Sequence, residues 1–138
     1  MRDNDRGSLS LMVVVLFVVL AALAGIVVDG GAKLTGDENA VAVAQEAARA
    51  GATSVDQSRA YTAGTFAVDR QEAVTAAAGY LSGAGYHQYA VAADGADAIR
   101  VTVRITEPTR FLSLIGIDSV TCTGTAIASL VTGVTGPS

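Results

Sequence analysis

Few side chains in this sequence could do chemistry, and those few do not converge on a catalytic pattern. The chain has one histidine, His87, and one cysteine, Cys122, so at most one Cys/His pair could form. Cys122 falls on the inward-facing positions of a predicted strand, which favours a small buried side chain over a nucleophile or an intermolecular disulfide. His87 follows a predicted helix, in a context typical of a surface loop.

Acidic residues gather at two places without the number of ligands that a metal site needs. Asp94 and Asp97 flank Gly95 in a predicted turn, and Asp37 precedes Glu38 near a predicted helix start. Turn formation and the helix N-terminus account for these acids better than calcium binding does. Neither a phosphate-binding glycine loop nor a G-x-S-x-G serine motif occurs. We therefore expect no enzyme, no catalytic residue, no metal and no cofactor.

Composition also excludes some partners. The 138 residues carry a net charge of −4 and include a single lysine, Lys33. Since nucleic-acid binding requires phosphate neutralisation, we expect no nucleic-acid partner. With three Phe, four Tyr and no Trp, the core must consist of small aliphatic side chains, which suit close helix packing.

The chain is organised around the apolar stretch Leu9–Val28, which contains no charged residue and only Ser10 as a polar side chain. As a helix it would span about 30 Å, the thickness of a bilayer's hydrocarbon core. We therefore predict a tail at residues 1–8, a transmembrane helix at 9–28 and an exported domain at 29–138.

Charge sets the expected orientation. Arg2, Arg6 and the terminal amine precede the stretch, whereas Lys33 follows it among acidic residues that include Asp29. The positive-inside rule predicts a single-pass cell-membrane protein with a cytoplasmic N-terminus and an exported C-terminal domain.

Three fates of the apolar stretch compete. It can remain as a signal anchor, be cleaved after Ala24 to give a secreted domain, or be trimmed between Gly7 and Ser8. We favour the uncleaved or tail-trimmed anchor, because apolar character continues past Ala24 to Val28 and signal-peptide apolar regions are shorter.

A helical pattern resumes after the membrane exit. Gly30 and Gly31 could bend the helix there, and Thr35 with Glu38 fits a capping box for an amphipathic helix at 35–54. Asp29 either marks the membrane boundary or makes a polar contact with a neighbouring subunit's helix. The apolar residues recur at spacings of three and four: Val41, Ala44, Ala48, Ala52 and Val55.

A second helix and three strands follow. A helix is predicted from residue 69 or 70 to residue 81, with Asp69 as its N-cap. The apolar face of this helix consists of Val74, Ala77, Ala78 and Leu81. Strands are predicted at 89–93, 99–106 and 119–131 from their period of two, with Pro108 stopping the second. Between the last two strands, Phe111, Leu112 and Leu114 or Ile115 could plug one end of the core.

These elements predict an α+β fold: an N-terminal transmembrane helix extended into an amphipathic helix, a second helix, and a three-stranded, mostly antiparallel sheet with the helices on one face. Arg6-Gly7-Ser8, the apolar stretch, the exit at residues 29–34 and the Ala-rich run at 44–52 resemble TadE/TadG-like pilus-assembly proteins. These are pilin-like minor subunits of tight-adherence (Flp-type) systems.

The resemblance implies a structural or assembly protein of a Tad-type pilus or related secretion apparatus, acting by helix packing. Its implied partners are other pilus or secretion-system subunits, in a homo- or hetero-oligomer. Trimming after Gly7 would place Met12 where pilin-type subunits usually carry a glutamate. The alternative function is a membrane-anchored extracytoplasmic binding module.

Overall fold

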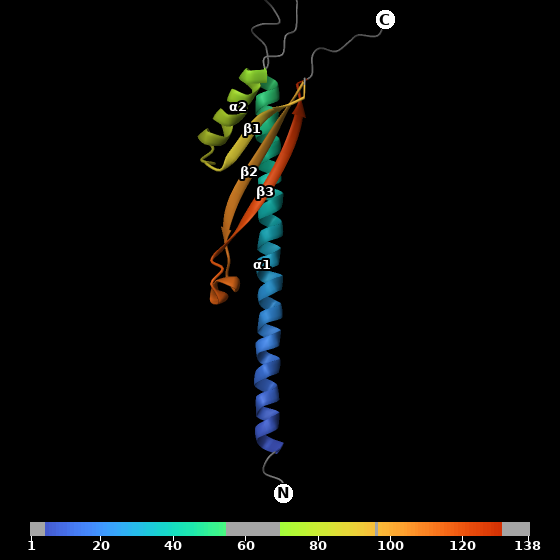
Figure 1. The fold of residues 1–138 in the computed structure, drawn as a ribbon, viewed down its shortest axis with the longest axis vertical. Helices are drawn as coiled ribbons and strands as arrows, with labels where there is room; N and C mark the ends of the chain where they lie inside the picture. Colours follow the sequence, from blue (N-terminus) through green and yellow to red (C-terminus); the bar gives the residue numbers. More distant parts are fainter. Residues whose placement is uncertain (1–4, 55–69, 96, 131–138) are drawn as a thin grey trace, which may run out of the picture.

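The computed structural model describes residues 5–54, 70–95 and 97–130, and side chains from residue 9 onward (Figure 1). Two residues of the predicted helices, Val55 and the Asp69 cap, lie outside the described residues. The predicted α+β architecture is confirmed. Its elements are α1 (Asp5–Ser54), α2 (Arg70–Gly83), β1 (Tyr89–Asp94), β2 (Ala98–Pro108), the 3-10 helix η1 (Leu112–Ile115) and β3 (Ser119–Ser129).

Helix α1 is one unbroken helix of 50 residues, about 75 Å long at 1.5 Å per residue. The expected bend at Gly30 and Gly31 is wrong, because the helical hydrogen bonding continues through both glycines. The expected capping box is also wrong. Thr35 Oγ1 donates to the Gly31 carbonyl at 3.2 Å, a bond to the preceding turn that places Thr35 in a helix interior.

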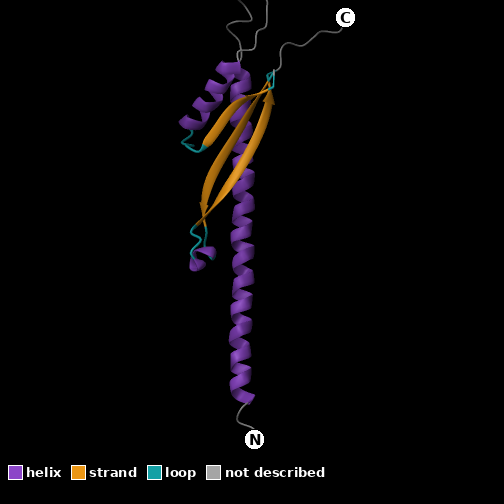
Figure 2. Ribbon diagram, in the orientation of Figure 1, coloured by secondary structure: helices purple, strands orange, loops and turns teal. Residues whose placement is uncertain are grey.

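The sheet has the order β1-β2-β3, and both pairings are antiparallel. Strands β2 and β3 each have 11 residues, whereas β1 has 6. At about 3.3 Å per residue the long hairpin extends roughly 35 Å, so half of it continues beyond β1 along α1 (Figure 2).

The core lies between one face of the sheet and the two helices. From the sheet, Ile99, Val101 and Val103 are fully buried, and from α1 the buried side chains are alanines, including Ala44 and Ala48. Small side chains allow the helix and sheet to approach closely. At Gly124 in β3, any Cβ atom would collide with the α1 backbone at Ala40 and Val41.

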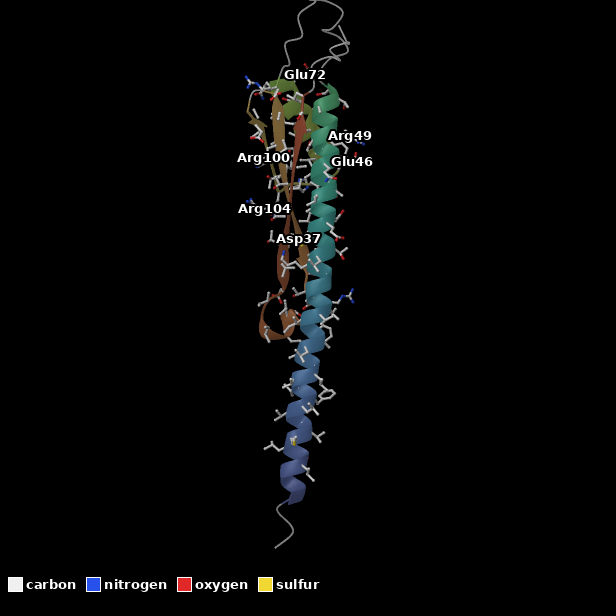
Figure 3. All side chains as sticks on the ribbon, turned by 90° about the vertical axis from the view of Figure 1, so that its right-hand side faces the viewer. Asp37, Glu46, Arg49, Glu72, Arg100 and Arg104 are labelled. Carbon is white, nitrogen blue, oxygen red and sulfur yellow. The ribbon has the colours of Figure 1, made fainter. Side chains whose placement is uncertain are left out.

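Helix α2 packs on α1 and β1. Its buried residues are Ala73, Ala77 and Leu81, while Val74 and Ala78 are half-buried. The predicted apolar face is therefore rotated by about one position. The outer face of the sheet carries Arg100 and Arg104, and the exposed surface of α1 carries Glu46 and Arg49, so charged side chains lie on both the sheet and the helix (Figure 3).

The apolar segment between the last two strands forms η1, but it does not plug the core as expected. The β2–β3 hairpin carries it along α1 toward the N-terminal half of that helix (Figure 1). There it contacts α1 near Gly25 and Asp29, and Leu114 and Ile115 remain 82% and 73% exposed. Gly116 ends η1 in the left-handed conformation with φ of 88°, which glycine adopts without steric cost.

Candidate membrane and assembly surface

The N-terminal half of α1 presents apolar side chains in all directions. Over residues 9–28 only Gly25 is buried, and large side chains such as Phe17, 72% exposed, have no cover from the chain itself. Among the described residues, α1 is the one helix long and apolar enough to cross a membrane. A helix that is apolar all round is typical of a membrane span, so this half of α1 is a candidate single-pass membrane span.

The predicted helix-packing alanines lie in the C-terminal half of α1, beneath the chain's own sheet. Ala44 and Ala48 are buried in the core, and Val41 and Ala52 are half-buried. The close approach that the stripe permits is therefore made within the chain. In this structure Ala44 and Ala48 have no free surface to offer a neighbouring subunit.

Asp29 binds the tip of the β2–β3 hairpin. Its Oδ1 accepts the Arg110 backbone N–H at 2.9 Å, and its Oδ2 accepts the N–H groups of Phe111 and Leu112 at 2.9 and 2.6 Å. The residue is 3% exposed. A carboxylate that accepts the free N–H groups of the first turn acts as an N-terminal cap for η1, contributed here by a helix some eighty residues away in the sequence.

Two opposing effects act on the Asp29 carboxyl. Burial raises its pKa, and the three backbone N–H donors lower it. The donors prevail, assisted by the positive charge of Arg110, so the pKa lies below its usual value. Asp29 is therefore ionised at neutral pH, and because it is buried and both of its oxygens accept bonds from the hairpin tip, its contact is made within the chain and not with a neighbouring helix.

A second polar contact joins α1 to the open edge of the sheet. Asp37 Oδ1 accepts the Thr123 N–H at 3.0 Å, and Lys33 Nζ lies 2.8 Å from Asp37 Oδ2 and 3.4 Å from the Thr121 carbonyl oxygen. The Lys33 side chain and the Thr123 N–H both lower the pKa of Asp37. These bonds use backbone groups of β3 that an exposed edge strand would otherwise offer to another chain.

The remaining candidates for chemistry stay apart. Cys122 is fully buried and directs its Sγ at the Lys33 carbonyl, 3.6 Å away, while burial, followed by the negative charge of Asp37, raises the pKa of its thiol. His87 is exposed in the loop after α2. Within the described residues, no three His, Cys, Asp or Glu side chains are grouped to hold a metal ion.

The processing candidates Gly7 and Ser8 lie in the first turns of α1. The functional residues that sequence reasoning missed are those of the hairpin tip, because nothing local pairs residue 29 with residues 110–112. A signal for them did exist: an apolar loop, residues 111–117, joins two strands that are too long for the small core.

Together the fold and this surface define a class of protein. It is an α+β protein in which one helix supplies both the candidate membrane span and one wall of the core. Residues 7–54 match the model of the TadE/G-like Flp pilus-assembly family, which confirms the resemblance over that segment. The match ends at Ser54, the last residue of α1, so the family signature and the long helix coincide. No curated protein and no solved structure matches the chain.

Proposed function

We propose that this protein is a pilin-like minor subunit of a Tad-type pilus or related secretion apparatus, and that it acts by packing its long helix against other subunits. The family match supports a pilus-assembly role, which is structural rather than enzymatic. The proposal of a pilin-like subunit that acts by helix packing is supported by one observation: the first half of α1 is apolar and uncovered, whereas the second half is covered by the sheet. In such a subunit the uncovered half is held in the membrane or bundled with like helices.

The packing surface in this proposal is the exposed apolar half of α1, together with the outward side of its second half. The buried alanines hold the domain against its own helix, so they position the packing surface rather than form it. A glutamate at the position of Met12 would set the register between subunits, and its absence leaves packing to apolar shape complementarity.

Site-specific crosslinking in the native host tests this assignment. A photoreactive amino acid at Val15 or Val27, both exposed on α1, should yield adducts with other subunits of the apparatus. The control position is Ala92, which is exposed on β1 and should give few adducts. Deletion of the gene should reduce surface appendages. A monomer without adducts, in cells whose appendages survive the deletion, would contradict the proposal.

The mature N-terminus gives an independent test. An anchor requires a chain that begins at Met1 or, after trimming, at Ser8. A mature chain that begins at Gly25 would lack most of the exposed apolar surface and would be a secreted domain. Mass spectrometry of the protein purified from membranes and from the medium distinguishes these three ends.

A membrane-anchored binding module is the second candidate function. A shallow hollow between α1 and the end of β3 favours it, since Arg49 and Glu46 border apolar side chains there, among them Ala126 and Ile127. Substitution of Arg49 by Glu would then abolish ligand binding without changing appendage number. Under the first proposal no ligand-dependent phenotype is expected from that variant.

A further inference from the structure

The hairpin tip, which we define as residues 109–118, exposes more apolar surface than a loop in water normally does. Its two strand ends are closed by a Thr109 N–H bond to the Asp118 carbonyl at 3.0 Å. Between them Leu114 and Ile115 are largely exposed, and Phe111 and Ile117 are 40% and 44% exposed. Clustered exposed apolar side chains on a small protein indicate a contact surface.

The tip lies at the level where α1 leaves the membrane. Phe111 packs so closely on Gly25 that a Cβ atom at that glycine would lie 2.8 Å from the Phe111 Cβ. Gly25 lies three residues before the end of the apolar stretch, which corresponds to about 4–5 Å along the helix axis. Because Asp29 holds the tip on the next turn, its depth relative to the membrane is fixed by the anchor.

We propose that this tip is a second membrane contact, whose apolar side chains insert among the lipid headgroups and upper acyl chains of the leaflet that faces the domain. Interfacial segments bury their apolar face roughly 5–10 Å into that region, which matches the depth at which the tip is held. Phe111 of the tip lies directly against Gly25, inside the apolar stretch of α1. Lipid is therefore the occupant that the position favours.

The polar groups of the tip agree with an interfacial site. The backbone N–H groups that open η1 bind Asp29, and the Gly116 and Ile117 N–H groups bind carbonyls within the tip. Insertion would therefore leave few backbone donors without partners. Arg110 and Asp118 are exposed at the base of the tip, where charged side chains reach headgroups and water.

Tryptophan fluorescence in lipid nanodiscs tests the proposal directly, because the chain contains no tryptophan. Leu114→Trp and, as a second variant, Ile115→Trp are made in the full-length chain. Quenching is measured with aqueous iodide and with phospholipids brominated near either end of the acyl chain. Ile127→Trp, on an exposed site of β3, is the control in water, and Phe17→Trp is the control in the anchor.

Insertion predicts that position 114 is quenched at least about twofold more by brominated lipid than position 127, and most by bromines near the headgroup. Strong quenching by iodide with none by lipid would overturn the proposal. Protection from both quenchers, with a crosslinked dimer through position 114, would overturn it in favour of a second copy of this chain.

The inference rests on the membrane anchor and not on the pilus role. Loss of lipid quenching at position 17 would overturn the anchor and the tip contact together, whereas the appendage assay tests the pilus role separately.

Discussion

Asp29 shows how one side chain can have a role that differs from the one its position in the sequence suggests. At the end of an apolar stretch, a carboxylate is ordinarily interfacial or paired with a neighbouring helix. Here it is buried and accepts three backbone N–H bonds from the hairpin tip. Charge-assisted hydrogen bonds to backbone N–H groups are stronger than neutral ones, so Asp29 determines where the tip docks on α1.

Substitution of Asp29 by Ala should therefore release the tip while the rest of the domain stays folded. The amides of Phe111 and Leu112 should exchange with solvent faster, on the order of tenfold, because each loses a charge-assisted hydrogen bond. Hydrogen exchange followed by mass spectrometry or NMR measures this. Asp118→Asn is the matched control, since it removes an exposed carboxylate from the same tip and should leave exchange unchanged. Unaltered protection in Asp29→Ala would show that packing on Gly25 alone holds the tip.

The Asp37 contact predicts an acid-sensitive attachment of the sheet to α1. Because the folded-state pKa of Asp37 is lowered, its contribution to stability is fully present above its ordinary pKa of 3.8 and is lost as the pH falls through the folded value. Thermal unfolding in mild detergent, from neutral pH to about pH 3, should show a midpoint that falls at the acid end. In Asp37→Asn the midpoint should be lower at neutral pH and less dependent on pH. An equally steep acid decrease in that variant would contradict the assignment.

Among the helices and strands, the close contact between α1 and β3 depends on glycines, which have no side chain to hold the two elements apart. Gly124 meets the α1 backbone directly, and Gly36 faces the Cys122 side chain. Backbone cannot move aside as a flexible side chain can, so the helix-to-strand distance is set at these glycines.

Gly124→Ala should thus destabilise the domain by about 1–3 kcal/mol, the usual cost of overpacking a core. Gly79→Ala is the matched control: the site lies in α2, is exposed, and has open space around its Cβ position. That variant should be neutral or gain up to about 1 kcal/mol of stability from its higher helix propensity. Chemical unfolding followed by circular dichroism compares the two. Equal stabilities would show that α1 and β3 can separate without cost.

The elements that could be predicted are those whose pattern is local. The alternation in residues 99–106 predicts a strand, and β2 confirms it to within two residues at each end. The apolar run at 9–28 is helical, but the helix that contains it continues to Ser54. The capping box predicted at Thr35 is wrong, because α1 is helical on both sides of that residue and its hydroxyl donates to the Gly31 carbonyl instead of capping a new helix. The docking of the tip on Asp29 was not predictable in this way, because it depends on the lengths of β2 and β3 relative to α1.

At the scale of the whole molecule, one helix connects three environments. Its first half is uncovered and apolar, its middle binds the hairpin tip through Asp29, and its last part forms the floor of the core. Since α1 is continuous, the domain cannot rotate or tilt independently of the anchor. The orientation of the anchor in the membrane therefore decides on which side the entire domain lies.

That orientation follows from a small charge difference and is the broadest prediction. An export-dependent enzyme fused to the C-terminus should be active, whereas a fluorescent protein that matures only in the cytoplasm should be dark, because Arg2 and Arg6 stay inside.

Gly30 and Gly31 have open space at their Cβ positions, so lysines fit there. Gly30→Lys/Gly31→Lys with both arginines changed to Gln should reverse the charge difference and lower the enzyme signal. Gly30→Gln/Gly31→Gln, with the arginines intact, controls for the loss of the glycines and should behave as the natural chain. An inactive enzyme and a bright fluorescent protein in the natural chain would place the domain in the cytoplasm, where it could not contribute to an extracellular filament.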